Sequence, residues 1–405
     1  MNQHDAMIPA PFVTDAKLSP GGCFDIVIIG GGPAGLNAGL HATRSGRRIS
    51  ILLIDKVVPW EHPIQCAEAV GRRGFEEAID VKPAWIRQTI NSVCFHSPDN
   101  TTITYTDKNG GYIIDRAAMQ RDCLQEIMNR GVTCALNRRV THVSTRERSM
   151  RFVEFSNGTG VYGRVVIDAS GPAACLGKNG LLAWKPLDLE PADFVLVEGN
   201  LSADTVHIYI SHDYAPGGYA WMFPRGRNSA NIGVLIGSGY KGKVNIRRLL
   251  DAFIARRFPG ISIVNQFAGA IPCGNRGGPT AAPGFIKAGD AASTVNPVSR
   301  AGISEALLSG GLAGDHALRM LDAPDEPHLR RIAGAYEAAW DKKRGARHKK
   351  LARVKDSLAQ VPEADYNSAA RALAQVPQNE LTMSKIFRTA LGRFPRLVWA
   401  LRHLM

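Results

Sequence analysis

A glycine-rich turn set between a strand and a helix is the feature of this sequence that most constrains its fold. Residues 24–29, Phe-Asp-Ile-Val-Ile-Ile, form a mainly apolar run rich in β-branched residues, which is typical of a buried parallel strand. The turn over residues 30–35 follows at once, the pattern over 36–45 predicts a helix, and residues 49–54 predict a second strand. These segments form a complete βαβ unit, which predicts an α/β fold of the Rossmann type.

Three glycines of this turn have the spacing G-x-G-x-x-G, which is typical of dinucleotide binding. Gly30 allows the tight turn, Gly32 lets the backbone approach a pyrophosphate, and Gly35 lets the helix pack close to the strand. The helix N-terminus then offers free N–H groups to the phosphates. Asp55 ends the second strand, where it can accept hydrogen bonds from ribose hydroxyls. A turn without a ligand is the alternative, and the agreement of strand, helix and terminal acid argues against it.

A second motif, residues 284–292, decides between NAD and FAD. Its apolar strand ends in Gly289-Asp290, and a helix is predicted to begin near Gly302-Ile303. Asp290 can accept hydrogen bonds from a ribitol chain, and the N-terminus of the helix can face a flavin ring. A plain helix-capping role for Asp290 is the alternative. A chain that returns to the same cofactor after a long insertion is typical of two-domain flavoproteins, so we predict FAD.

The excess of positive charge lies mainly in the C-terminal part of the chain. The net charge is +13, and residues 341–405 hold 14 Lys and Arg against 5 Asp and Glu, which is +9 of that total. The remainder is only mildly basic, which argues against nucleic acid as a partner. Residues 384–405 mix apolar and basic side chains. This pattern suits an anionic membrane surface or, equally, a helix that packs on the domain with a solvated basic face.

The cysteines and the N-terminus predict a cytoplasmic location. Seven cysteines are scattered without close pairing or metal-ligand spacing, so we predict a reducing compartment and no metal site. Residues 1–22 lack the apolar stretch of a signal peptide, and we interpret them as a flexible leader. No apolar run of about 18 residues occurs. A peripheral position on the inner face of the membrane is the alternative location.

The rest of the chain predicts a division into regions. We assign residues 23–185 and 280–325 to a discontinuous FAD-binding domain, with part of the substrate sheet inserted near 75–112. Strand patterns and glycine-rich turns over 186–279 predict an antiparallel substrate-binding sheet. Residues 326–405 predict a basic, helical C-terminal region.

Four local elements are also predicted. The pattern over 116–130 indicates an amphipathic helix, and that over 299–320 indicates a long one. Asn157-Gly158 between two strand patterns predicts a hairpin, and residues 109–111 predict another turn.

Four blocks of residues resemble the FAD-dependent geranylgeranyl reductases, which share the fold of p-hydroxybenzoate hydroxylase. The glycine turn and Gly289-Asp290-Ala291-Ala292 are common to many flavoproteins. Cys66-Ala67-Glu68-Ala69 is similar to the family's Cys-Ala-Glu-Gly, and residues 219–224, Tyr-Ala-Trp-Met-Phe-Pro, look like its Tyr-x-Trp-x-Phe-Pro signature. The resemblance runs from about residue 25 to the C-terminus. Archaeal digeranylgeranylglycerophospholipid reductases and bacterial menaquinone side-chain reductases are the most similar branches.

The resemblance implies an activity and a set of cofactor contacts. The activity is saturation of C=C bonds in a prenyl chain of a lipid or quinone by hydride transfer from reduced FAD, with NADPH, ferredoxin or another reductant as electron donor. Carried over by position, the implied flavin contacts are Ala34, Asp55, Cys66, Ala67, Ala69, Arg116, Val140, Asp290, Gly302 and Ile303. The chain departs from the family at Met119-Gln120, where Phe-Asp is usual, and at Ala69, where the family has glycine.

The aromatic block predicts where the substrate binds. Tyr219, Trp221 and Phe223 alternate along a strand, so their side chains fall on one face. We predict that this face binds the prenyl chain, with Tyr219 and Trp221 as catalytic residues. Cys66 is the third predicted catalytic residue, whose thiol donates a proton or shapes the pocket. On composition alone, an aromatic face packed into the core is the alternative.

Two other functions fit the same cofactor. An aromatic monooxygenase or halogenase has this fold, and Asp168-Ala169-Ser170-Gly171 is similar to the hydroxylases' Asp-Gly segment, although Ala stands second. A non-enzymatic prenyl-lipid carrier is the other alternative. The aromatic block favours the reductase. No second dinucleotide fingerprint is visible, so we predict no stable NADPH domain.

Overall fold

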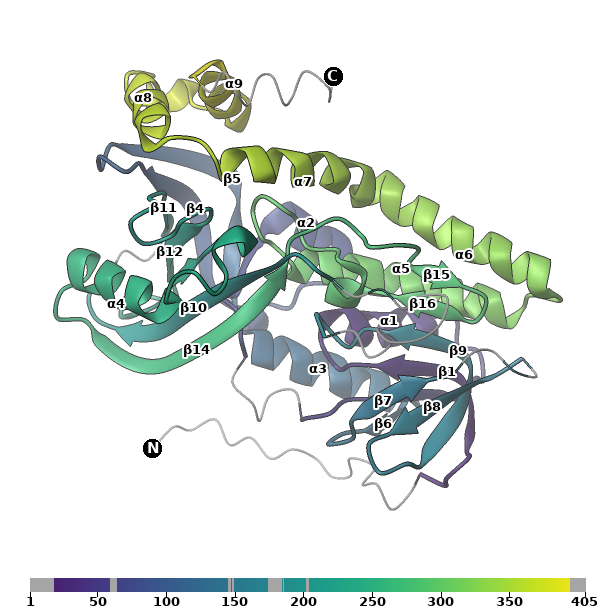
Figure 1. Cartoon of the computed structure of the whole chain (residues 1–405). Coiled ribbons are helices and arrows are strands. Elements are labelled where there is room, and N and C mark those ends of the chain that lie inside the picture. Colours follow the sequence, from purple (N-terminus) through teal and green to yellow (C-terminus); the bar gives the residue numbers. More distant parts are fainter. Residues whose placement is uncertain are drawn as a thin grey trace.

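Two β-sheets and a layer of helices make up the protein (Figure 1). The computed structural model describes residues 18–58, 64–144, 147, 149–173, 184, 186–201 and 204–393. The first sheet carries the glycine-rich turn, the second sheet lies at the other end of the molecule, and a pair of long helices runs along both (Figure 1). The sequence prediction of a Rossmann-type α/β unit joined to a second sheet is confirmed.

The first sheet contains the predicted βαβ unit. Its central path has the order β15 (Ala281–Ala282), β16 (Phe285–Lys287), β9 (Gly160–Asp168), β1 (Cys23–Ile29), β2 (Ile51–Ile54) and β6 (Thr133–Ala135). From β16 to β6 all pairings are parallel. A hairpin of β7 (Val140–Val143) and β8 (Arg151–Phe155) continues from β9. The glycine turn therefore lies at the carboxyl end of the central strand, where α/β folds bind ligands.

Helices α1 (Pro33–Thr43) and α5 (Ile303–Leu321) pack against each other with almost no side chains between their backbones. A Cβ atom at Gly310 would overlap the carbonyl oxygen of Ala34, and one at Gly314 would overlap that of Ala38. Helix α3 (Arg116–Asn129) also packs on α1. Because α1 starts at the glycine turn, this seam fixes the first turn of α5 close to it.

The second sheet takes its strands from three separate parts of the chain. Its order is β14 (Ser262–Pro272), β10 (Leu189–Glu198), β13 (Ser229–Leu235), β12 (Tyr219–Pro224), β11 (Thr205–Tyr209), β4 (Ile86–His96), β5 (Thr102–Ile114) and β3 (Ala69–Gly71). All pairings are antiparallel except that of β11 with β4. Helix α4 (Ile246–Arg257) covers one face through Leu250, Phe253 and Ile254. The opposite face carries the aromatic block.

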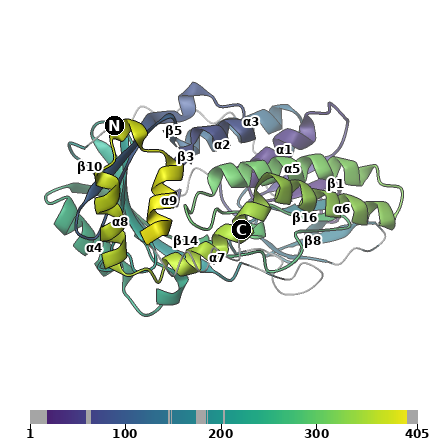
Figure 2. The same ribbon diagram turned by 90° about the horizontal axis from the view of Figure 1, so that it is seen from above.

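The C-terminal region is helical, as the sequence predicts. Helix α6 (Glu326–Trp340) continues through a π-helical turn over Asp341–Gly345 into α7 (Ala346–Leu358). Helices α8 (Glu363–Ala374) and α9 (Met383–Arg393) follow and lie over the second sheet (Figure 2). No helix among the described residues is long and apolar enough to cross a membrane. The predicted amphipathic segment 384–405 lies largely outside the described residues.

The structure confirms the predicted hairpin and differs from the prediction at three other local elements. The hairpin at Asn157-Gly158 is confirmed by the antiparallel pairing of β8 with β9. The turn predicted at 109–111 is wrong, because Gly110 and Gly111 lie inside β5, where a Cβ atom would overlap carbonyl oxygens of neighbouring strands. The long helix begins at Ile303 rather than at residue 299. Helix α2 (Arg72–Ala78) was not predicted.

Candidate functional site

The glycine turn and Asp55 form a preorganised unit. Gly30 has φ of +107°, and a Cβ atom there would overlap the carbonyl oxygen of Ala169. Asp55 Oδ2 accepts a hydrogen bond from the Gly31 N–H at 2.5 Å, and Oδ1 accepts one from Val57 at 3.0 Å. Burial raises the pKa of this carboxyl, and the backbone N–H groups oppose that rise. The carboxylate that the sequence assigns to ribose is thus held directly beside the turn.

The two predicted cofactor motifs meet in space. Gly289 has φ of +62°, and a Cβ atom there would lie 2.8 Å from the Cβ of Ala34 in α1. The Gly289 N–H donates to the Ser309 hydroxyl at 3.0 Å. Asp290 is the next residue, and its carboxylate has no hydrogen-bond partner among the residues that the structure describes. Burial raises the pKa of Asp290 to about 6, although Arg116 opposes the rise.

The residues present fit an FAD molecule. A Cβ atom at Gly32, the N-cap of α1, would meet nothing within 4 Å, so there is open space beside the start of this helix. Free backbone N–H groups at this end of α1 can bind a pyrophosphate there. Asp290 directly follows Gly289, which meets Ala34 of α1, and hydroxyl donors of a ribitol chain would satisfy its carboxylate. Of the predicted contacts, Gly302 caps α5 and would place a Cβ atom 3.9 Å from Asp290 Oδ1, and Ile303 begins the helix.

Three residues that sequence reasoning did not assign to the site tie its parts together. Gln120 is buried, accepts from Arg116 Nε at 2.8 Å and donates to the Gly31 carbonyl at 3.4 Å. Glu68, buried with φ of +62°, accepts from the Arg116 N–H at 3.0 Å and forms an ion pair with Arg225. The contact between Gln120 and Arg116 could have been found in the sequence, because Gln120 stands one helical turn after Arg116 in a predicted helix. The pairing of Glu68 with Arg225 joins residues far apart in sequence and could not be predicted.

The Cys66-Ala67 segment connects these cofactor residues to the second sheet. Cys66 Sγ accepts a hydrogen bond from the Glu68 N–H at 3.3 Å, and the thiol is partly buried. Ala67 packs against the cluster that contains Trp221. Ala69 then begins β3 at the edge of the second sheet. We call the glycine turn, residues 30–35, and the loop over residues 289–302 the cofactor loops. The Cys66-Ala67 segment thus passes from the region of these loops to the aromatic face.

Tyr219, Trp221 and Phe223 share one face of β12, as predicted. The Tyr219 and Trp221 rings are 6.2 Å apart and those of Trp221 and Phe223 are 6.0 Å apart. We call this face the aromatic wall, and it includes their neighbours Ala67, Ala192, Phe194, Ile208, Leu235, Phe267 and Ile271. Trp221 is only 3% exposed, whereas Tyr219 and Phe223 are half-buried.

Both polar atoms of the aromatic wall are engaged. The Tyr219 hydroxyl donates to the Ser299 carbonyl at 2.8 Å, and Trp221 Nε1 donates to Asn231 Oδ1 at 2.8 Å. Ser299 belongs to the loop between Asp290 and α5, so Tyr219 joins the wall to the cofactor loops. Burial raises the pKa of the Tyr219 hydroxyl well above its ordinary value.

Two predicted residues lie at other places. Val140 begins β7 and packs in the apolar cluster on the face of the first sheet opposite α1. Asp168, from the segment similar to the hydroxylases, ends β9 and is fully buried, and its Oδ1 accepts from the Ser170 N–H and hydroxyl. Ser170 therefore satisfies one oxygen of this carboxylate locally.

One group of metal-type donors comes together that the sequence spacing did not reveal. The ligand atoms of Cys94, His96 and His207 lie within 4.8 Å of one another on β4 and β11. The two imidazoles already form a hydrogen bond of 2.9 Å with each other. Burial lowers the pKa of His96 to about 4, with smaller contributions from His207 and Arg257, and burial also lowers the pKa of His207. A hydrogen-bonded pair of neutral histidines accounts for this arrangement.

Comparison with known proteins agrees with this geometry. A family model described as geranylgeranyl reductase catalytic domain matches residues 191–271, and a lycopene cyclase protein model matches residues 25–185. A digeranylgeranylglycerophospholipid reductase from Methanoculleus marisnigri is 30% identical over 394 residues, which cover 94% of this chain and 98% of the relative.

Two solved structures extend the comparison to the fold. A geranylgeranyl bacteriochlorophyll reductase-like protein from Thermoplasma acidophilum superposes with a TM-score of 0.85 at 20% identity, over 95% of this chain and all of that one. A flavin-dependent brominase superposes with a TM-score of 0.67 at 19% identity, over 92% of this chain and 99% of that one. The fold is thus shared among flavin-dependent enzymes, and the sequence match narrows it: the chain belongs to the geranylgeranyl reductase family.

Proposed function

We propose that this protein binds FAD and saturates C=C bonds in a prenyl chain of a lipid or quinone. The observation that carries the proposal is the contact between the aromatic wall and the cofactor loops. Tyr219 joins the wall to the loop that follows Asp290, and Ala67 joins it to the Cys66 segment. An apolar chain lying on the wall would therefore lie beside the cofactor. The names of the relatives support a geranylgeranyl chain as the substrate.

The side chains of the site supply orientation and exclusion of water rather than strong acids or bases. FAD, when bound and reduced, supplies the hydride. The wall contributes an apolar surface of tilted aromatic rings, which holds an isolated alkene in one orientation. Since the polar atoms of Tyr219 and Trp221 already have partners, we propose that these two residues position the substrate. The Cys66 thiol is the proton donor in this proposal, because the Glu68 N–H fixes its sulfur at the junction of wall and cofactor loops.

A single-turnover assay tests the proposed reaction. The protein is loaded with FAD, reduced with dithionite without oxygen, and mixed with a geranylgeranylated lipid in detergent. We expect lipid masses that increase in steps of two hydrogens, as the flavin becomes oxidised. The control is the same mixture without FAD. Flavin that binds and is reduced but leaves the lipid mass unchanged would contradict the proposal and favour a prenyl-lipid carrier.

Cys66→Ala tests the proton donor separately. We expect the variant to keep its bound FAD and to lose most of its turnover or give a different pattern of products. Cys23→Ala is the matched control, because Cys23 is an exposed thiol at the start of β1. Unchanged turnover and products in Cys66→Ala would assign the thiol only a role in pocket shape.

The rival monooxygenase or halogenase function makes a different spectroscopic prediction. Reduced protein of that class forms a long-lived hydroperoxide absorbance when exposed to air. We expect reoxidation without this absorbance. The similar fold of the brominase does not decide the matter, because flavin enzymes of different activity share it.

The proposed partners of the protein are an electron donor and a membrane surface. Among NADPH, ferredoxin and other reductants, the rate of anaerobic flavin reduction by each identifies the donor. For residues 384–405 we propose binding to an anionic membrane surface, where lipid substrates lie. Their deletion is expected to reduce sedimentation with vesicles that contain anionic lipid, while neutral vesicles serve as the control. Undiminished sedimentation would leave this segment the role of a packing helix.

A further inference from the structure

We propose that Glu190 is a positioning residue that holds the loop before α5, residues 296–302, against the aromatic wall and the cofactor. This inference rests on the proposed function, because it concerns the same site. Glu190 is only 1% exposed and lies on β10 of the second sheet. Its backbone pairs with Ile271 of the wall, but among the described residues its carboxylate pairs only with Arg300 and Lys355, so it acts on the loop through Arg300.

Glu190 binds two cations from two different parts of the chain. Its Oε2 accepts from Arg300 Nε at 2.8 Å, and its Oε1 lies 3.1 Å from Lys355 Nζ. Arg300 belongs to the loop before α5, whereas Lys355 belongs to α7 and also pairs with Asp188. The side chains of Arg300 and Lys355 are 8% and 6% exposed. The carboxylate therefore joins the second sheet, the loop and the C-terminal helices at one buried point.

The contacts of Arg300 determine the conformation of the loop over residues 296–302. Arg300 has φ of +59°, a conformation that a residue with a side chain holds only when its surroundings fix it. Asn296 holds the backbone of the loop, because its carbonyl accepts from the Arg300 N–H at 2.9 Å. Glu190 and the Val298 carbonyl, which accepts from Arg300 Nη1 at 2.6 Å, hold the Arg300 side chain and so tie this loop to the second sheet. Without Glu190, Lys355 would keep Asp188, but the buried Arg300 guanidinium would lose the carboxylate that it binds, which is unfavourable.

The loop over residues 296–302 contacts both the aromatic wall and the region of Asp290. Ser299, one residue before Arg300, accepts the hydrogen bond from Tyr219 of the wall. Gly302, two residues after Arg300, caps the N-terminus of α5 beside Asp290. A helix N-terminus stabilises nearby negative charge, which reduced flavin carries. The tie through Glu190 thus sets the distance of this N-terminus from the cofactor and of the wall from both.

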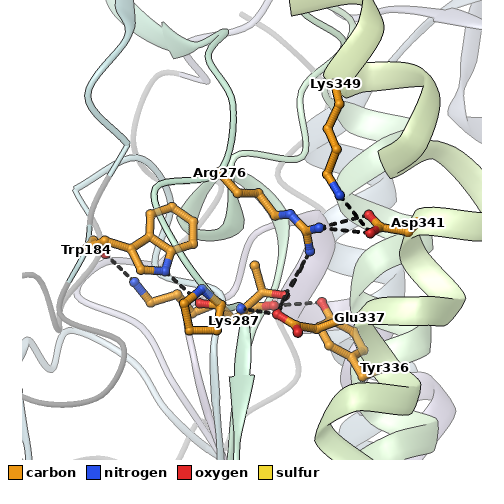
Figure 3. Close-up of polar contacts among 9 residues, drawn as sticks. Trp184, Arg276, Lys287, Tyr336, Glu337, Asp341 and Lys349 are labelled. Carbon is orange, nitrogen blue, oxygen red and sulfur yellow. Dashed lines mark hydrogen bonds and ion pairs between the residues drawn. The ribbon is translucent and has the colours of Figure 1, made fainter.

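Other ion pairs of the C-terminal helices do not reach this loop and provide a matched control. Arg276 donates to both oxygens of Asp341 at 2.9 and 3.1 Å, and Lys349 donates to Asp341 at 2.9 Å (Figure 3). This cluster also joins the helices to the body of the protein, and Figure 3 shows it beside Glu337 and Lys287. Asp341→Asn therefore removes a comparable tie without touching the loop.

The experiment compares Glu190→Gln with Asp341→Asn in the full chain loaded with FAD. We expect Glu190→Gln to fold and bind FAD, but to lower its preference for reduced over oxidised FAD about tenfold, which corresponds to a potential about 30 mV more negative. We expect the single-turnover rate with prenyl lipid to fall about tenfold, with little change in KM. Asp341→Asn should keep the wild-type potential. Equal potentials in Glu190→Gln and wild type would overturn the proposal.

Two Arg300 variants keep the test decisive if Glu190→Gln does not fold. Arg300→Gly keeps the left-handed backbone without strain but loses the tie, so we expect a shift in potential similar to that of Glu190→Gln. Arg300→Lys retains a cation for Glu190 and should restore most of the potential. A wild-type potential in Arg300→Gly would overturn the proposal. The potential is measured without lipid, so absence of prenyl reduction would count against the proposed function and not against this inference.

Discussion

Gly32 and Gly35 stand three residues apart in one turn, yet a side chain would act differently at each. At Gly35 a Cβ atom would overlap the carbonyl oxygen of Gly30, so the fold itself needs the glycine. At Gly32 a Cβ atom would enter open space, so only a ligand can need it. The pair therefore separates the requirements of folding from those of the cofactor.

Substitution by alanine at these two positions should give opposite patterns. Gly35→Ala is expected to destabilise the FAD-free protein by about 1–3 kcal/mol, because the backbone must move to relieve the overlap. Gly32→Ala should leave the melting temperature of the FAD-free protein unchanged and weaken FAD binding at least about tenfold. Differential scanning fluorimetry and FAD fluorescence titration measure the two quantities. Normal FAD affinity in Gly32→Ala would place the pyrophosphate elsewhere.

Asp290 gives the FAD-free protein a dependence on pH that can be measured. Its pKa is about 6 in the fold against an ordinary 3.8, mainly through burial. Because the fold favours the protonated form, its stabilising contribution is complete below pH 3.8 and is lost as the pH rises through 6. Asp290→Asn stays neutral, so it should be more stable than wild type above that pH by about 3 kcal/mol and equal at low pH. Urea unfolding from pH 4 to 8 tests this; a constant difference would contradict it.

Sequence patterns could predict those site residues that lie within one local motif. Gly30, Gly32 and Asp55 belong to a single βαβ unit, whose spacing has a physical meaning. Glu190 and Arg300 carry no such signal, because each lies in a segment of ordinary composition and they are joined only by the tertiary fold. Buried ion pairs of this kind depend on contacts that single-sequence patterns do not contain.

At the scale of elements, the seam between α1 and α5 determines the geometry of the cofactor loops. Gly310 and Gly314 let the two backbones approach until no side chain fits between them. Gly311 adds to the seam, where a Cβ atom would lie 2.7 Å from the His41 ring. These three glycines are therefore the reason that α5 lies so close to α1.

Gly310→Ala should separate the helices and disturb the cofactor site. We expect a loss of about 1–3 kcal/mol of stability, since the new methyl group has no space against the Ala34 backbone, together with weaker FAD binding. Gly334→Ala, on the exposed face of α6 with nothing within 4 Å, is the matched control and should stabilise the protein by about 0.5–1 kcal/mol. Chemical denaturation of both variants measures these changes. Equal stabilisation by both would show that the seam can relax.

Element prediction succeeded where the period of apolar residues was clear and failed where glycine had a tertiary role. The βαβ unit and the β8–β9 hairpin follow from local pattern. Gly110-Gly111 predicted a turn, but the glycines serve the close approach of β4, β5 and β3 inside the sheet. A glycine in a sequence can indicate either a turn or a close approach of two backbones. Only the positions of the neighbouring strands distinguish these two roles.

On the scale of the whole molecule, the C-terminal helices divide into two parts with different attachments. Helix α7 reaches the cofactor loops through Lys355 and Glu190. Helix α8 instead attaches to the far edge of the second sheet, where Arg371 pairs with Asp99 and Ala370 and Leu373 pack on Ile103. Helix α7 and helix α8 are thus attached at two different parts of the second sheet.

Truncation after residue 360 should separate stability from cofactor binding. Loss of α8 and α9 exposes Ile103 and leaves Asp99 without Arg371, so we expect a melting temperature lowered by several degrees. FAD affinity should stay within about twofold of wild type, because α7 and its ties remain. Truncation after residue 345, which also removes α7 and Lys355, is the comparison and should weaken FAD binding. Equal FAD affinities in the two truncations would show that α7 does not influence the cofactor loops.

The aromatic wall and the core under α4 lie on opposite faces of the same strands. Successive residues of β12 belong alternately to the wall and to the core, with Trp221 on one side and Met222 on the other. Substitutions of the half-buried Tyr219 and Phe223 therefore leave the core under α4 intact, whereas a substitution of the buried Trp221 would disturb the packing of the wall itself. Under the proposed function, evolution and enzyme engineering alike can change the length or branching of the accepted chain through Tyr219 and Phe223, while the core under α4 stays as it is.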